Sequence, residues 1–518
     1  MKSPKVIVIG LDGGTWSLVR PWSVKGDLPT FKRLLGEGVH GMLQTIIPPI
    51  TAPAWASFAT GKNPGKHGIF DFIKMEGNNV RMLSTEDLRS DTFYDILSRE
   101  GFRSIIVGLP LSFPPKKDFN GIMISDFLYP RKEIEPKEKS RYLDGYQVWS
   151  LQSIDAIERT AINRIRTTKK LIANESWDFF FLHYGETDWI SHRLWASVRN
   201  NKRLSRKAKH IFVIADQFLD WLLKWMDEKC YLFVISDHGF RDCPMKINLN
   251  RIFIRERLLE VCPKKTLDPR SVYSNLYRGE KTSRLPKFIL RFLNYIETNN
   301  YNLYRKIFKP LLAGKARSRY EMGIDFENSK VFKPNDESFG IYVNEQTVEK
   351  REKIVEEVIG ILEHVQYKRN KVFKRILRRE EIYSGAYINE APDIIGIPNG
   401  FFISKTLDRP LFERYVEGGQ HDLNGIFLAY GPDIRKDIEI KNVGICDIAP
   451  TTLHIFGLPI PSDMDGRVLV EIFGDHSELK KRTPIYVKPT HYNKLTKQRL
   501  NFKEEERIKN RLRKLGYL

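Results

Sequence analysis

The pattern of hydrophobic and polar positions predicts buried strands that alternate with amphipathic helices. Continuous apolar runs, which are typical of central parallel strands, occur at residues 5–9, 103–108, 177–184, 231–235, 340–344, 392–397 and 425–430. Helical spacing of apolar residues occurs at 28–36, 52–60, 92–100, 154–173, 211–227, 348–365 and 443–456. This alternation favours an α/β fold around a mostly parallel sheet.

Two prolines, Pro48 and Pro49, interrupt the chain just before the helix predicted at 52–60. Because proline presets the backbone and ends a strand, we expect Thr51 at a strand-to-helix turn with its hydroxyl available to a ligand. The first amides of the helix would face the same ligand, which suits an anion. The alternative interpretation is that Thr51 is an ordinary N-cap.

Acidic residues and histidines follow the predicted strands where these end. They are Asp12, Asp188, His192, Asp237, His238 and His421, the last in a glycine-rich loop before a strand. Because the carboxyl ends of parallel strands meet at one edge of a sheet, we expect these side chains to lie together with Thr51. Carboxylates and imidazoles suit zinc or a similar divalent ion, and six of them suffice for two ions.

Each of these residues has a simpler explanation when it is taken alone. Asp12 is then a turn former, the Asp188–His192 pair lies on a solvated helix face, and His421 is a loop histidine. Asp237 and His238 are the sharper signal, because two ionisable groups directly after a buried strand would otherwise have no role. The conjunction of all these positions at strand ends favours a metal centre.

The net charge of +21 is concentrated in two segments. Residues 251–323 contain 17 Lys and Arg against 6 Asp and Glu, and residues 476–518 contain 13 against 4. The strand–helix alternation also stops over residues 251–323, which are rich in aromatic residues. We therefore expect a catalytic core at residues 1–250 and 324–475, a basic cap or insertion at 251–323 and a basic tail at 476–518.

These two basic segments allow a function of a different class. Basic residues interleaved with aromatic ones suit single-stranded nucleic acid, and a basic tail helix suits an anionic membrane surface. The simpler interpretation is a solvated cap and tail. A steep salt dependence of binding that is lost on deletion of residues 476–518 would support the binding function.

The cysteines and the apolar runs bear on the compartment. The four cysteines are scattered and form no CxxC pair, which argues against a disulfide framework and fits a reducing compartment. The first apolar run is too short for a signal peptide, and no later run reaches the ~18 residues of a membrane span. The sequence therefore predicts a soluble, cytoplasmic protein.

Five segments, VIVIGLDGG, TAPAWASFATGKNPGKHGIFDF, ETDWISH, SDHGF and GGQH, occur in this order along the chain. Together they resemble the motifs of the alkaline phosphatase superfamily, and most closely those of its type I phosphodiesterase/nucleotide pyrophosphatase family. The resemblance implies a three-layer α/β/α sandwich and a metal-dependent phosphoesterase that acts on a small phosphate ester, with phosphodiester or pyrophosphate bonds as the expected targets.

The resemblance also implies roles for the individual residues. Asp12, Thr51, Asp237 and His238 would hold one divalent ion, and Asp188, His192 and His421 the other. Zinc is the expected metal, with manganese or another divalent ion as the alternative. Thr51 would be the nucleophile that forms a covalent phosphothreonine, which water then hydrolyses.

One position departs from the family pattern. The motif usually continues HGIIDN, and Phe72 stands here in place of the asparagine that helps to bind a phosphate oxygen. Lys62 or Asn63 is a candidate replacement donor. The departure leaves open a phosphomonoesterase, or a phosphotransferase acting on a sugar or lipid head group. A sulfatase is disfavoured, because its modified Cys/Ser-x-Pro-x-Arg motif is absent.

Overall fold

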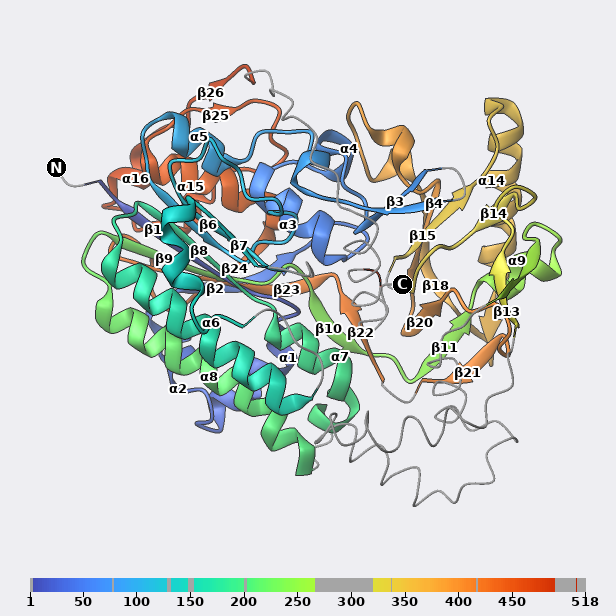
Figure 1. Cartoon of the computed structure of the whole chain (residues 1–518), viewed down its shortest axis with the longest axis horizontal. Coiled ribbons are helices and arrows are strands. Elements are labelled where there is room, and N and C mark those ends of the chain that lie inside the picture. The colour runs from blue at the N-terminus through green and yellow to red at the C-terminus, as the bar shows by residue number, and fades with distance from the viewer. Residues whose placement is uncertain are drawn as a thin grey trace.

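The computed structural model describes residues 3–76, 79–127, 132–147, 153–199, 203–265, 320–336, 338–415, 418–489 and 509. Within these residues the larger part of the molecule is built on a nine-stranded sheet (Figure 1). In spatial order its strands are β24 (Ile438–Gly444), β2 (Val39–Gln44), β23 (Asn424–Tyr430), β9 (Cys230–Ile235), β1 (Lys5–Leu11), β8 (Phe179–Tyr184), β5 (Ser104–Val107), β6 (Gly121–Ser125) and β7 (Glu133–Glu135).

Helices cover both faces of this sheet (Figure 1). One face packs against α1 (Trp16–Val24), α2 (Pro29–Glu37), α6 (Ile154–Asn174), α7 (Glu186–Arg199) and α8 (Arg203–Trp225). The other face packs against α3 (Thr51–Thr60), α5 (Phe93–Arg99) and α15 (Ile448–Phe456). Strand β1 shows why both faces are apolar, since Ile7 and Ile9 enter the first core and Val6 and Val8 enter the second. The predicted three-layer α/β/α fold is confirmed.

The directions of the strands bring the carboxyl ends of β1, β2, β8 and β9 to one edge of the sheet. Strands β9, β1 and β8 are parallel neighbours, while β23 runs antiparallel between β9 and β2. Strand β2 therefore points the same way as β9, and the start of β23 lies at the edge where β9 ends. The segments that follow β1, β2, β8 and β9, and the segment that precedes β23, all meet at this edge.

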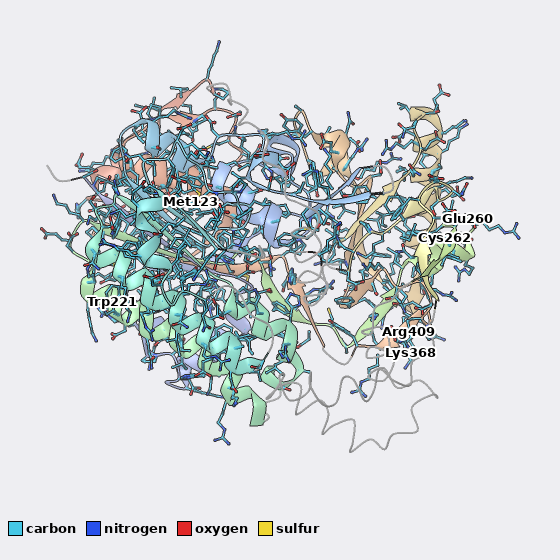
Figure 2. All side chains as sticks on the ribbon, in the orientation of Figure 1. Met123, Trp221, Glu260, Cys262, Lys368 and Arg409 are labelled. Carbon is cyan, nitrogen blue, oxygen red and sulfur yellow. The ribbon has the colours of Figure 1, made fainter. Side chains whose placement is uncertain are left out.

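A smaller part of the molecule is inserted between β10 (Gly239–Asp242) and β22 (Gly419–Asp422), which pair with each other (Figure 1). Its sheets combine β11 (Met245–Asn248) with β20 (Phe401–Ser404) and β21 (Phe412–Arg414), and β14 (Val331–Phe332) with β15 (Gly340–Val343), β19 (Ile394–Pro398) and β18 (Phe373–Arg378). Helices α9 (Asn250–Arg255) and α14 (Val348–Glu363) complete its own apolar core. Figure 2 shows Met123 among the side chains of the larger part and Cys262 and Arg409 in the smaller part.

The remaining elements are short. They include α4 (Pro64–His67), α16 (Glu478–Lys481), and the paired strands β3 (Ile73–Glu76) with β4 (Asn79–Met82), β12 (Val261–Lys265) with β13 (Tyr320–Ile324), β16 (Gln366–Tyr367) with β17 (Asn370–Lys371), and β25 (Ile460–Pro461) with β26 (Tyr486–Val487). Within the described ranges, no helix combines the length and the apolar character needed to cross a membrane.

Two predicted elements need correction. The helix predicted at 443–456 begins only at Ile448, because Val443 still belongs to β24 and pairs with Leu43 of β2. His421, predicted in a loop, lies in the short strand β22 opposite Phe240.

The predicted boundaries at residues 250, 323 and 475 stay predictions. Residues 266–319 of the basic cap and 490–508 of the basic tail lie outside the described residues, as do 510–518. The anionic partner proposed for these segments stays a prediction for the same reason.

Candidate metal centre

The functional edge of the large sheet brings together all seven residues that the sequence predicts as metal ligands. Asp12 follows β1, Asp188 lies in the first turn of α7 after β8, and Asp237 follows β9. Thr51 is the first residue of α3, which the loop after β2 leads into, and His421 lies in β22 just before β23. All seven side chains are buried or nearly so: side-chain exposure is 10% for His192 and at most 2% for Asp12, Asp188, Asp237, His238 and His421, and Thr51 is fully buried.

One group of contacts converges on the Nε2 atom of His238. This nitrogen lies 3.2 Å from Thr51 Oγ1, 3.3 Å from Asp237 Oδ2 and 3.5 Å from Asp12 Oδ1. Candidate ligand atoms of Asp12, Asp237 and His238 all lie within 4.8 Å of one another. This is the grouping expected for the first ion.

A second group of contacts converges on Asp188. Its Oδ1 atom lies 3.2 Å from His192 Nε2 and 3.5 Å from His421 Nε2, and these two nitrogens are 2.8 Å apart. The rings of His238 and His421 stack with their centroids 3.5 Å apart, so the two groups adjoin. His238 lies within reach of both, because Asp188, His238 and His421 also offer ligand atoms within 4.8 Å.

Three carboxylate oxygens in these groups lack a hydrogen-bond partner among the described residues. They are Asp12 Oδ1, Asp188 Oδ1 and Asp237 Oδ2, the same atoms that face the imidazole nitrogens. The companion oxygens are partnered, Asp12 Oδ2 by His183 and Asp237 Oδ1 by the amide of Gly13. A buried carboxylate oxygen without a partner is costly, and a cation between these atoms would satisfy all three. The residues therefore fit a divalent metal centre.

The backbone fixes which nitrogen of two imidazoles faces the centre. His421 Nδ1 donates to the carbonyl of Pro49 at 2.8 Å, and His238 Nδ1 donates to the carbonyl of Gly239 at 3.1 Å. When Nδ1 carries the proton of a neutral imidazole, Nε2 has a free lone pair. Both Nε2 atoms then point at the carboxylate oxygens as metal ligands do.

The electrostatics of the cluster favour a cation in the same place. Burial, together with the charge of Asp188, raises the pKa of Asp12 well above its usual range, and burial together with the charge of Asp12 does the same to the pKa of Asp237. Burial alone would raise the pKa of Asp188, but the imidazoles of His192 and His421 outweigh it and hold that pKa well below its usual range. Burial lowers the pKa of His238 and keeps this ring neutral. Carboxylates crowded together in this way are stabilised by positive charge.

Helix α3 presents Thr51 to this centre. Ile50 occupies the N-cap position and makes no side-chain cap, so the Thr51 hydroxyl does not serve as an N-cap and instead faces His238. All ten residues of the helix are buried. The helix lies close against β1, because a Cβ atom on Gly10 would come 2.4 Å from the ring of Trp55. The N-terminal amides of a helix held in this way form an anion site.

The sequence did not reveal His183, which completes the Asp12 side of the centre. His183 lies in the apolar strand β8, opposite Gly10 of β1, and its Nε2 is 2.6 Å from Asp12 Oδ2. A histidine inside an otherwise apolar strand was the one available signal. Its partner depends on strand register, which a single sequence does not show.

A network of buried charges continues behind the centre. Arg164 of α6 contacts Glu186 Oε1 at 3.1 Å and Asp126 Oδ2 at 2.9 Å, and it bonds to the Tyr146 hydroxyl at 2.7 Å. Glu186 is two residues before Asp188, and every member of this network is buried.

The three predicted substrate-binding residues lie elsewhere. Lys62 Nζ pairs with Asp463 Oδ2 at 2.5 Å, and Asn63 bonds to Asp465 at 2.9 Å. Both follow the far end of α3, about 15 Å of helix away from Thr51. Phe72 is buried and stacks on Phe127 with ring centroids 6.0 Å apart. The structure does not bring Lys62 or Asn63 into the metal cluster, and their role in substrate binding stays a prediction.

The fold is alkaline-phosphatase-like, and the family model identifies a metal-dependent phosphoesterase, a hydrolase of phosphoric ester bonds. A family model described as type I phosphodiesterase/nucleotide pyrophosphatase matches residues 6–423, and the chain belongs to this family. The family is metal-dependent and typically uses two divalent ions. A search of curated proteins found no match.

Solved structures with the same fold include two enzymes from different sources. Murine ectonucleotide pyrophosphatase/phosphodiesterase 5, as an inactive threonine-to-alanine variant in complex with AMP, is 15% identical, with a TM-score of 0.50 over 88% of this chain and 95% of that chain. Phosphonoacetate hydrolase from Sinorhizobium meliloti 1021, in complex with phosphonoacetate, is 15% identical, with a TM-score of 0.53 over 88% of this chain and 96% of that chain.

Proposed function

We propose that the protein hydrolyses phosphodiester or pyrophosphate bonds of a small phosphate ester through a covalent phosphothreonine on Thr51. The observation that carries this proposal is the position of Thr51 Oγ1, 3.2 Å from His238 Nε2 at the N-terminus of a buried helix. Three carboxylate oxygens without a partner among the described residues lie in the same cluster.

The buried charge supports the presence of two divalent ions. The connected cluster contains five carboxylates, those of Asp12, Asp126, Asp188, Asp237 and Glu186, and a single guanidinium, that of Arg164. With all five carboxylates ionised and the imidazoles neutral, four negative charges would lie away from water, a cost that raises the pKa of Asp12 and Asp237 unless cations compensate it. Two divalent cations would compensate them. Zinc is the first candidate, because the ligands are carboxylates and imidazoles.

Two sets of residues would hold the ions. Asp12, Thr51, Asp237 and His238 form one, and Asp188, His192 and His421 form the other, with His238 close enough to contact both. When bound, the ions would lower the pKa of the threonine hydroxyl and of a water molecule and neutralise charge on the phosphate oxygens.

The chain's own residues would carry out the rest of the reaction. Thr51 Oγ1 attacks phosphorus, a new O–P bond forms on the threonine, and the bond to the leaving-group oxygen breaks. The N-terminal amides of α3 face the phosphate oxygens during this step. Water then attacks the phosphothreonine, releases the phosphate product and restores the hydroxyl.

The solved structures and Phe72 bear on the substrate. The structural neighbours bind AMP and phosphonoacetate, which are small ligands with a phosphate or phosphonate group. Phe72 has no side-chain donor for a phosphate oxygen, and this observation favours a second candidate function, namely a phosphomonoesterase or a phosphotransferase. Rates on p-nitrophenyl phosphate and bis(p-nitrophenyl) phosphate, with and without an alcohol acceptor, distinguish these functions.

The first testable prediction concerns the Thr51→Ala variant. Turnover should fall on the order of 10³-fold or more, because the nucleophile is lost, while the content of bound metal stays near that of the wild type. Steady-state rates and elemental analysis measure the two quantities. The inactive threonine-to-alanine variant of the murine neighbour is consistent with this expectation.

The matched control is Thr60→Ala at the other end of the same helix. Thr60 is equally buried. Its hydroxyl donates to the carbonyl of Ala56 and accepts from the amide of Lys62. This variant should keep its turnover. A Thr51→Ala protein that still hydrolyses the diester would show that Thr51 is not the nucleophile.

A further inference from the structure

We infer that His183 is a positioning residue that sets the orientation of the Asp12 carboxylate for ion binding. The inference rests on the proposed function, because it assigns Asp12 to a metal ion. His183 Nε2 and Asp12 Oδ2 are 2.6 Å apart, and both side chains are almost completely excluded from solvent. As a metal ligand Asp12 is ionised and supplies no proton at this contact, so His183 Nε2 is then the donor.

Two further connections of Asp12 fix its backbone, whereas its carboxylate contacts His183 and also interacts with the side chains of Asp237 and Trp55. The Asp12 amide donates to the carbonyl of Tyr184 at 3.1 Å, and the Thr187 hydroxyl donates to the Asp12 carbonyl at 2.6 Å. These two bonds hold the main chain at the end of β1. Rotation of the carboxylate is restrained by His183, which holds Oδ2 and leaves Oδ1 facing His238 Nε2 at 3.5 Å.

The imidazole of His183 is itself held in place by aromatic rings. Phe127 lies edge-on to it with a centroid distance of 4.9 Å, and Trp55 lies edge-on at 5.5 Å. A Cβ atom on Gly185 would come 3.0 Å from His183 Cε1, so the backbone at Gly185 also packs against the imidazole ring. Phe72 stacks behind Phe127. The ring therefore cannot turn freely, and its N–H stays aimed at Asp12.

This packing gives Phe72 a role that differs from the substrate contact expected at its position. Its ring supports Phe127, Phe127 supports His183, and His183 holds Asp12. Phe72, Phe127 and His183, from three separate segments, thus connect the HGIFDF segment to Asp12, a ligand of the proposed metal centre.

The experiment measures metal affinity in three variants. His183→Phe keeps an aromatic ring but removes the N–H, and His183→Gln restores an N–H near the position of Nε2. His454→Phe is the matched control, since His454 is also buried and donates through Nε2 to a backbone carbonyl, that of Leu479 on the C-terminal side of the fold. Competition with a chromophoric chelator gives the affinity for Zn²⁺ and Mn²⁺, and circular dichroism of the metal-free proteins reports folding.

The affinity of His183→Phe should be 10- to 100-fold below that of the wild type, the usual effect of removing a partner of a metal ligand. His183→Gln should recover most of the loss, and His454→Phe should bind as the wild type does. If His183→Phe does not fold, His183→Gln is compared with His183→Asn instead. The shorter side chain of asparagine cannot reach Asp12, so His183→Asn should bind the metal ions more weakly than His183→Gln.

The outcomes separate the inference from the proposed function. Wild-type affinity in His183→Phe, or equal affinities in the Gln and Asn variants, overturns the positioning role while leaving the metal centre intact. A wild-type protein that binds neither ion overturns the proposed function together with the inference.

Discussion

The evidence for the metal centre consists of the positions of single side-chain atoms. Asp237 provides a test of it, because its substitution should raise stability without metal and lower it with metal. Its Oδ1 accepts from the amide of Gly13, whereas its Oδ2 has no partner among the described residues and lies 3.3 Å from His238 Nε2. In Asp237→Asn the amide group can keep the first bond and donate to His238. Without metal, this variant should be more stable than the wild type by about 1–3 kcal/mol at neutral pH, because the carboxyl group, whose pKa burial and the charge of Asp12 raise, no longer has to be buried as a charge or to take up a proton on folding.

With Zn²⁺ present, the wild type should be more stable than Asp237→Asn. The variant lacks one anionic ligand, so the metal raises its melting temperature less than that of the wild type. Thermal unfolding with EDTA and with a zinc titration measures both effects. Asp216→Asn is the control, because Asp216 of α8 is also buried but accepts from two amides of α2, those of Thr30 and Phe31. A metal-free Asp237→Asn protein less stable than the wild type would argue against repulsion in the cluster.

At the residue level, the sequence shows those ligands that follow buried strands. Asp12 and Asp237 could be predicted because an ionisable residue directly after an apolar strand is unusual. His183 could not be predicted, because its contact with Asp12 depends on the register of β1 and β8. The network of Arg164, Glu186 and Asp126 was missed for a related reason, since its members come from three separate segments.

Among the elements, the packing of α3 on β1 determines where Thr51 lies. Gly10 permits this packing, because a Cβ atom there would come 2.4 Å from the Trp55 ring. Gly10→Ala should therefore push α3 outward, destabilise the protein by about 1–3 kcal/mol and lower kcat, since Thr51 moves with the helix. Chemical denaturation and steady-state kinetics measure the two effects.

Gly36→Ala is the control for this prediction. Gly36 lies inside α2, and beyond the backbone of that helix and its two chain neighbours no atom of the described residues lies within 4 Å of the position that its Cβ would take. Alanine there should be neutral or stabilise the helix by up to about 1 kcal/mol. Equal kcat values for the wild type and Gly10→Ala would mean that the position of Thr51 does not depend on this contact.

Most elements could be predicted because they are long and strongly patterned. The strand at residues 5–9 and the helix at 154–173 match β1 and α6 within two residues. The boundary between β24 and α15 was missed, because Val443 and the apolar residues after it also fit helical spacing. The short strand β22 was missed because Gly418 and Gly419 at its start are typical of a loop. Its pairing with β10 is a contact between residues far apart along the chain, which a single sequence does not show.

The described residues form two parts, and we expect a buried contact between them to depend on pH. Asp71 follows α4 in the larger part, and its carboxylate accepts from the side chain of Asn335, which precedes β15 in the smaller part. This pairing could not be predicted from the sequence, because the two residues are far apart along the chain. Burial raises the pKa of Asp71 to about 6, although the amide of Phe72 and the side chain of Asn335 lower it in part.

A carboxyl group whose pKa is higher in the folded than in the unfolded state stabilises the fold at low pH. That stability is lost as pH rises through the folded pKa. For Asp71 the loss extends from about pH 4, near the unfolded pKa, to about pH 6 and amounts to about 3 kcal/mol. Asp71→Asn cannot ionise, so the difference in unfolding free energy between the wild type and this variant should change by that amount over this range and stay constant above pH 7.

Urea denaturation at every whole pH value from 4 to 8 measures this difference. Subtracting the unfolding free energy of the variant from that of the wild type cancels the contribution of every group that titrates alike in both proteins. Asp393→Asn is the comparison within the smaller part, since Asp393 is also buried but is paired with Arg351 at 2.7 Å. Its variant should lose stability through the broken ion pair. A difference curve for Asp71→Asn that is flat over this range would show that the carboxyl group does not ionise at the contact between the two parts.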